Sequence, residues 1–124
     1  MALTAEHCEA CQAGAPMVTD DEERQLKPQI PDWELIEVSG VRRLQRTFRL
    51  KGWMPAVQFA NAVARIADEE DHHPSILIEW GKVTVTWYTH KIRGLHRNDF
   101  IMAAKTDALA SEVGALPAAE ANRS

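Results

Sequence analysis

The spacing of the apolar residues changes twice along this chain, and this change limits the fold more than any other feature of the sequence. Over residues 41–50, apolar and polar residues alternate, and Leu44 and Phe48 fall on one side, as in a strand with one buried face. Over residues 53–70 the spacing becomes helical, and over residues 83–90 it returns to every second residue. The chain therefore places strands both before and after a long helix.

The helical stretch carries one stripe of small and apolar side chains, which comprises Ala56, Phe59, Ala60, Val63, Ile66 and Ala67. Such a stripe is typical of a helix packed on a core. Pro55 is tolerated because it lies in the first turn, where its missing N–H leaves no hydrogen bond unmade. Pro74 restricts the residue before it, so the helix has to end earlier. We expect this helix over about residues 53–70.

Turn residues interrupt the alternating stretches and make each of them a β-hairpin. The first hairpin comprises residues 33–38 and 41–50 around Ser39-Gly40, and the second comprises residues 76–80 and 83–90 around Gly81. Thr19 is expected to cap a short helix, and Pro28 prevents that helix from continuing. A last helix is expected from about Asn98 to Val113.

The order helix, two strands, helix, two strands, helix predicts an α+β fold, in which a four-stranded antiparallel sheet has its helices packed on one face. We expect residues 19–113 to form a single domain, residues 1–18 an extended or flexible segment, and residues 114–124 a flexible tail. The other face of so small a sheet is left open and its edges are exposed. The chain is therefore expected to form a homodimer or a higher homo-oligomer.

Charge and composition exclude several classes of protein. The 124 residues carry a formal net charge of −4, which argues against a protein that binds nucleic acid through phosphate attraction. The basic residues of one cluster alternate with apolar residues, as on the solvated face of a strand: Arg42, Arg43, Arg46, Arg49 and Lys51. The sequence has no run of eighteen apolar residues, which is about the length needed to span a membrane. No basic stretch followed by an apolar one marks a secretory signal, so the expected location is cytoplasmic.

Cys8 and Cys11 form a single Cys-x-x-Cys motif beside His7. A structural zinc site needs four ligands, and the sequence has no second cysteine pair. A redox dithiol usually lies at the start of a helix that follows a strand, whereas these cysteines lie in the N-terminal segment. We assign the motif no function.

Histidines supply the best candidates for chemistry. His72 and His73 directly follow the long helix, and His90 lies near the end of the last strand. Asp68 lies one helical turn before His72, so its carboxylate can orient that imidazole and raise its basicity. Adjacent histidines in a loop are also often exposed and idle, and composition alone supports the two interpretations about equally.

A metal site is the competing interpretation, since three histidines could hold a zinc ion with water as the fourth ligand. Neighbouring residues of an extended chain project to opposite sides, so His72 and His73 would need an unusual bend to share one ion. The sequence has neither His-x-His nor His-x-x-x-His spacing, and we expect no metal or other cofactor. No glycine-rich phosphate loop is present either.

The sequence resembles the pterin-4a-carbinolamine dehydratases in one ordered set of residues: Asp68, His72, His73, Pro74, Trp80, His90 and Asp99. Members of this family carry an acidic residue, His-His-Pro, an aromatic residue, a further histidine and an aspartate in this order and at this spacing. The resemblance covers roughly residues 19–113. Residues 79–87 and 94–100 are especially similar to the bacterial branch.

The resemblance implies that the chain removes water from 4a-hydroxytetrahydropterin and gives quinonoid dihydropterin, without metal or cofactor. The product is then reduced to the tetrahydropterin that aromatic amino acid hydroxylases use, which implies a functional link to such a hydroxylase. The implied general acids and bases are His72, His73 and His90. In this scheme Asp68 orients His72, and Asp99 secures the start of the last helix.

Asp71 and Trp33 are the expected substrate contacts, since a tryptophan can stack on a flat heterocycle. Two alternatives to this enzyme stay open. One is a non-catalytic module for protein interaction or dimerisation, of the transcriptional coactivator type that the family includes in animals. The other is a relative that acts on a different pterin.

Overall fold

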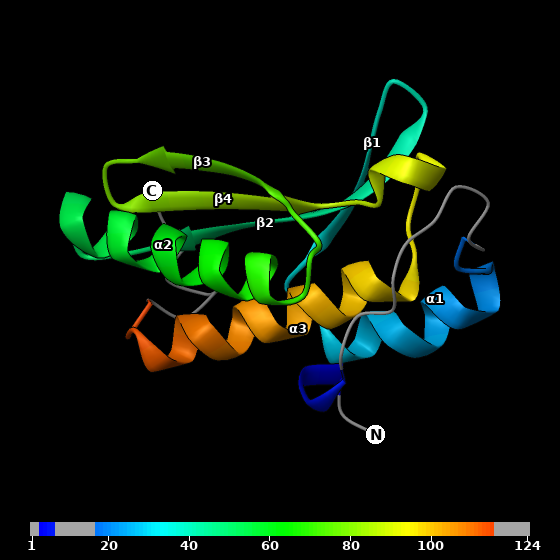
Figure 1. Ribbon diagram of the computed structural model, residues 1–124, viewed down its shortest axis with the longest axis horizontal. Coiled ribbons are helices and arrows are strands. Elements are labelled where there is room, and N and C mark those ends of the chain that lie inside the picture. Colours follow the sequence, from blue (N-terminus) through cyan, green and yellow to red (C-terminus); the bar gives the residue numbers. More distant parts are fainter. Residues whose placement is uncertain (1–2, 7–16, 116–124) are drawn as a thin grey trace.

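The computed structural model describes residues 3–6 and 17–115, in which a four-stranded antiparallel sheet carries the helices on one face (Figure 1). The helices are α1 (Asp20–Leu26), α2 (Trp53–Glu69) and α3 (Arg97–Glu112), and the strands are β1 (Glu34–Val38), β2 (Val41–Arg49), β3 (Ser75–Glu79) and β4 (Lys82–Trp87). Short 3-10 turns form η1 (Leu3–Ala5), η2 (Lys27–Gln29) and η3 (His90–Ile92). The predicted α+β fold and the order of its helices and strands are confirmed.

The two hairpins meet at the centre of the sheet, where β2 pairs with β4 in the strand order β1-β2-β4-β3. The register places Leu44 opposite Trp87 and Phe48 opposite Val83. All four side chains are buried on the side of the helices. The alternation seen in the sequence therefore corresponds to the core face of the two central strands.

The residues between them face away from the helices and form a polar surface. Gln45 donates a hydrogen bond to Thr86 at 3.0 Å, and the hydroxyls of Thr47 and Thr84 share one at 3.0 Å. Figure 1 shows that α2 and α3 lie on the other side of the sheet. We call this uncovered surface the open face.

Local sequence determines where α1 begins and ends. The hydroxyl of Thr19 accepts a hydrogen bond from the N–H of Glu22 at 3.1 Å, and the Glu22 carboxylate accepts one from the N–H of Thr19 at 3.0 Å. This reciprocal cap satisfies two N–H groups at the start of the helix. Pro28 follows within η2 and has no N–H to extend the helix. The predicted short, capped helix is confirmed.

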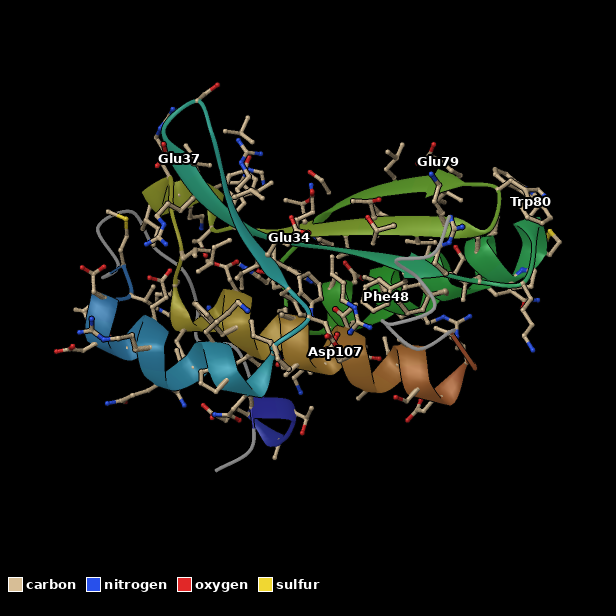
Figure 2. The ribbon with its side chains drawn as sticks, turned by 180° about the vertical axis from the view of Figure 1, so that it is seen from behind. Glu34, Glu37, Phe48, Glu79, Trp80 and Asp107 are labelled. Carbon is tan, nitrogen blue, oxygen red and sulfur yellow. The ribbon has the colours of Figure 1, made fainter. Side chains whose placement is uncertain are left out.

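The core lies between the sheet and the two long helices. Phe48 points from β2 toward the helices (Figure 2), and its ring centroid lies 4.8 Å from that of Phe59 on α2. The predicted stripe of α2 is buried or half-buried. On α3, Ile101 and Ala104 are buried, whereas Ala108 is exposed. Thr106 and Ala110 occupy the inward face, and a residue two positions away lies about 200° around the helix from each of them.

One basic residue expected on the solvated face of β2 lies on the core side instead. Arg46 pairs with Val85, so it faces the helices, and its Nη1 lies 2.6 Å from Oδ1 of Asp107 on α3. Nε1 of Trp33 donates to the same oxygen at 2.8 Å. Figure 2 shows Asp107 on the helix beneath the sheet. The guanidinium is tolerated there because the carboxylate balances its charge.

The last strand is shorter than the sequence predicts. β4 ends at Trp87 rather than at His90, because Thr89 forms an isolated bridge to Gly94 and the chain between them turns as η3. Arg93 completes this turn in a left-handed conformation, with φ of 52°. His90 therefore leaves the sheet at a turn and does not continue the alternation.

Part of the N-terminal segment expected to be extended or flexible is folded. Leu3 lies in η1 and is buried in the core cluster, and η1 packs against α3. The bidentate contact of Arg97 with Glu6 holds this turn to the helix at 2.8 and 2.9 Å. Cys8 and Cys11 lie outside the described residues. Within the part of the chain described, no helix has the length and apolar character needed to cross a membrane.

Candidate active site

The chain turns at the end of α2, and this turn places His72 on the helix side of the sheet. Asp71 adopts a left-handed conformation directly after the helix, with φ of 50°, and the N–H of His72 then donates to the carbonyl of Ala67 at 3.0 Å. The imidazole stacks on Trp87 of β4, with ring centroids 5.7 Å apart and an interplanar angle of 6°. Only 7% of His72 is exposed, so backbone and ring contacts together fix its orientation.

Asp99, in the first turn of α3, is the centre of a buried hydrogen-bond network. Its carboxylate accepts from Nε2 of His72 at 2.7 Å, from the hydroxyl of Thr89 at 2.8 Å and from the N–H of His96 at 2.9 Å. The last bond closes the first turn of α3. We call His72, Thr89, His96 and Asp99 the Asp99 network. Because an ionised carboxylate only accepts, His72 carries its proton on Nε2, and Nδ1 is its other nitrogen.

The expected contact between Asp68 and His72 is wrong. α2 ends at Glu69, so the one-turn spacing that holds within a helix does not continue to residue 72. Asp68 lies beside His73 instead, with its Oδ1 3.5 Å from Nε2. Both of these side chains are largely exposed, and water weakens such a contact. The partner that orients His72 is Asp99.

His73 lies on the open face, opposite to its neighbour His72. The register of β3 with β4 begins at Ser75, which lies opposite Thr86 of the open face, two residues after His73. Residues two apart in an extended chain share a face, so His73 shares the open face with Ser75. Its side chain is 58% exposed. The two adjacent histidines therefore have different surroundings, with His72 buried and His73 exposed.

His90 reaches the same open face from η3. Its ring lies against that of Tyr88, with centroids 4.1 Å apart, and its side chain is exposed. The guanidinium carbon of Arg43, on β2, lies 4.1 Å from the centroid of the Tyr88 ring. We call Arg43, His73, Tyr88 and His90 the Tyr88 cluster. This cluster offers two solvent-accessible imidazoles and one cation around a single aromatic ring.

Two residues of the Asp99 network are adjacent in sequence to residues of the Tyr88 cluster. Asp99 binds His72 and Thr89, and each of these residues immediately precedes an exposed histidine. His73 follows His72, and His90 follows Thr89. One buried carboxylate thus holds the chain next to both exposed imidazoles.

The two expected substrate contacts lie in different surroundings. Trp33 is 1% exposed and packs edge-on against Phe48, with ring centroids 5.9 Å apart. This placement corrects the prediction for Trp33, because a side chain buried in the core has no free surface for a ligand. Asp71 is exposed and lies in the turn directly before His72.

Four residues of the site were missed by reasoning from sequence: Arg43, Tyr88, Thr89 and His96. Alternation along β4 could have placed Tyr88 on the open face, where its partner strand also presents Arg43. Thr89 carries no such signal, because its contact with Asp99 depends on the bridge to Gly94 that ends the strand.

A cavity of about 220 Å³ lies between the end of η3 and the β1–β2 turn. It is lined by Met17, Val18, Glu37, Gly40, Arg42, Arg93, Gly94 and Leu95. None of the candidate site residues contributes to it. Within residues 3–6 and 17–115, no three His, Cys, Asp or Glu side chains are placed to hold a metal ion together.

Comparison with known proteins identifies the family. A family model described as pterin 4 alpha carbinolamine dehydratase matches residues 15–109. A Nitrosococcus oceani protein, provisionally named pterin-4-alpha-carbinolamine dehydratase, is 57% identical over 107 residues, which cover 86% of this chain and 95% of that protein. A Gloeobacter violaceus protein, provisionally named pterin-4-alpha-carbinolamine dehydratase 1, is 52% identical over 116 residues, which cover 94% of this chain and 100% of that protein.

A solved structure agrees with these relatives. The crystal structure of a Brucella melitensis transcriptional coactivator/pterin dehydratase matches with a TM-score of 0.69 and 29% sequence identity. The match covers 77% of this chain and 99% of that one. The chain belongs to the pterin-4-alpha-carbinolamine dehydratase family.

Proposed function

We propose that this chain removes water from 4a-hydroxytetrahydropterin to give quinonoid dihydropterin, with His73 and His90 as the acid and the base. The family is one of hydro-lyases, and the relatives compared above are named for the carbinolamine. The observation that carries the proposal is the Tyr88 cluster, which offers two exposed histidines, one of them against the Tyr88 ring.

The reaction requires one proton donor and one proton acceptor. Loss of water breaks the bond between C4a and the hydroxyl oxygen and forms a C4a=N5 double bond. One imidazolium donates a proton to the departing hydroxyl, which leaves as water, and a neutral imidazole takes the proton from N5. The two transfers balance, because one proton is delivered and one is removed. Imidazole is the side chain that most often serves as a general acid or base near neutral pH.

The Asp99 network contributes to the proposed reaction by positioning histidines. Asp99 holds Nε2 of His72 and so fixes the orientation of this buried ring. The stack on Trp87 keeps this ring from turning. In this mechanism the network positions His73 and His90, since it holds the residue before each of them.

The rate of carbinolamine loss tests the proposal. The carbinolamine is generated enzymatically and its loss followed by ultraviolet absorbance, with the spontaneous loss without protein as the baseline. We expect wild type to accelerate the loss, and His73→Ala and His90→Ala each to lower the rate constant by about 10²–10⁴-fold. Glu79→Gln is the control, because Glu79 lies at the far turn of the second hairpin (Figure 2) and is exposed.

Full activity in both histidine variants would overturn the assignment of these residues. No acceleration by folded wild type would overturn the dehydratase itself. That result would favour a different pterin substrate or a non-catalytic interaction role. The name of the B. melitensis relative, a transcriptional coactivator/pterin dehydratase, supports the interaction role.

We also propose that the chain forms a homodimer or a higher homo-oligomer. β3 is an edge strand, and it presents Leu77 at 57% exposure beside Trp80 at 73%. Exposed apolar residues on an unpaired edge favour association with another chain. A monomeric mass in analytical ultracentrifugation at micromolar concentration would contradict this proposal. The functional link to an aromatic amino acid hydroxylase follows from the product alone, and the cytoplasmic location stays a prediction.

A further inference from the structure

We propose that Arg43 is a specificity-determining residue, which binds an oxyanion on the C6 substituent of the pterin. This inference rests on the proposed function, because it places the substrate at the Tyr88 cluster. It commits to a class of substrate in which the substituent carries a carboxylate or a phosphate.

Arg43 differs from its neighbours Arg42 and Arg46 in having no carboxylate partner. Arg42 lies 2.8 Å from Glu23, and Arg46 lies 2.6 Å from Asp107. Among the described residues, no carboxylate forms an ion pair with Arg43, and its buried Nε has no hydrogen-bond acceptor. A buried donor left without an acceptor is costly. Nε itself is buried out of a ligand's reach, so the terminal Nη groups, which no carboxylate engages, are the donors available to a ligand.

The position of Arg43 suits a ligand that reacts at His90. Its guanidinium carbon and the His90 ring each lie 4.1 Å from the Tyr88 ring centroid, so the two groups are within about 8 Å of one another. The stack on Tyr88 holds the guanidinium in place without using its N–H donors. The cation thus lies within about 8 Å of the exposed imidazole of His90.

The chemistry of the pterin indicates which part of the substrate Arg43 meets. C6 is bonded to N5, the atom that loses its proton in the proposed reaction. A pterin whose C4a–N5 edge lies at His73 and His90 therefore carries its C6 substituent beside that edge, within reach of a side chain as long as arginine. A guanidinium matches carboxylate and phosphate oxygens with two parallel hydrogen bonds.

Binding of two unreactive pterins tests this inference separately from turnover. Dissociation constants for pterin-6-carboxylate and 6-methylpterin are measured by fluorescence quenching for wild type, Arg43→Met and Arg49→Met. Arg49 is the matched control: it lies on the same strand and, six residues on, on the same face, but opposite Lys82 at its far end. We expect wild type to bind the carboxylate about tenfold more tightly than the methyl compound.

The ratio of the two constants decides the outcome. Arg43→Met should bring the ratio to about one, Arg49→Met should keep the wild-type value, and added salt should reduce the wild-type ratio. Arg43→Lys, which retains the charge without the planar fork, should give an intermediate ratio. Equal binding of the two pterins by wild type, or an unchanged ratio in Arg43→Met, would overturn the inference.

Turnover separates this inference from the proposed function. Carbinolamines with a 6-methyl group and with a phosphate ester on the C6 substituent are compared by kcat/KM, and a preference for the ester that Arg43→Met removes supports the phosphate as the oxyanion. A preference found only in the binding experiment supports the carboxylate. Acceleration of both carbinolamines without any preference, together with equal binding, would overturn the role of Arg43 and leave the dehydratase intact. Selective binding without acceleration would do the reverse.

Discussion

His72 and His73 are neighbours in sequence, yet the fold gives them opposite surroundings. His72 is 7% exposed, with Nε2 bonded to Asp99 at 2.7 Å and its ring stacked on Trp87. The His73 side chain is 58% exposed, and its contact with Asp68 is long, at 3.5 Å. A buried imidazole with a fixed proton serves the structure of the site, whereas an exposed one is free to exchange protons with a substrate.

The largest expected effect that tests this contrast is on stability. Asp99→Ala leaves three donors without an acceptor, and we expect it to lower the free energy of unfolding by about 3–5 kcal/mol. Urea denaturation followed by circular dichroism measures the change. Asp68→Ala is the matched control, because Asp68 is exposed and its loss should cost less than about 0.5 kcal/mol. Equal losses in the two variants would show that the buried network contributes no more to the free energy of unfolding than an exposed side chain does.

Exchanging the two histidines for alanine compares their surroundings directly. We expect His72→Ala to lower the free energy of unfolding by about 2–4 kcal/mol, because it leaves a cavity beside Trp87 and removes a partner of Asp99. His73→Ala should change it by less than about 0.5 kcal/mol. The same denaturation measurement on both variants suffices, and a larger loss for His73→Ala would reverse the comparison.

Thr89→Val tests whether the buried network positions the exposed histidines. The substitution keeps the shape of the side chain and removes only the hydroxyl that donates to Asp99, at an expected cost of about 1–2 kcal/mol in unfolding free energy. Because Thr89 precedes His90, kcat should also fall under conditions where the variant is fully folded. Thr84→Val, on the open face of β4, is the control. Full activity in folded Thr89→Val would show that the Asp99 network does not affect the reaction.

A smaller effect concerns a second carboxylate, that of the half-buried Asp107. Burial raises the pKa of Asp107 above its usual 3.8, although Trp33 and Arg46 act to lower it. The folded state therefore holds this proton more tightly than the unfolded state, so the stabilising contribution is complete below the unfolded pKa and is lost as pH rises through the folded pKa.

Replacing Asp107 with asparagine should remove this contribution. As the pH rises from about 3.8, the stability of wild type should fall relative to that of Asp107→Asn, which denaturation at a series of pH values measures. A difference between the two proteins that is constant across this range would contradict the prediction. The pH profile of dehydration, normalised to folded protein, should be the same for both, since Asp107 lies in the core away from the histidines.

Local signals were sufficient to predict the helices and strands. The change of period predicted α2 and both hairpins, and Thr19 and Pro28 predicted the ends of α1. The partner of His72 was beyond such reasoning, because Asp99 lies 27 residues away and meets it only through the end of α2 and the start of α3. Arg46 shows the same limit, since a basic residue on the core side needs a carboxylate from another element to be tolerated.

The strand order brings together a site whose residues come from two separate segments of the chain. The proposed proton-transfer residues and their support all lie between positions 72 and 99, on and around the second hairpin, whereas Arg43 comes from the first hairpin and meets them only across the β2–β4 pair. Substitutions on β2 can therefore alter which substituent is accepted while the residues of the reaction stay unchanged. Within such a family, substrate preference can diverge on one segment while selection preserves the chemistry on the other.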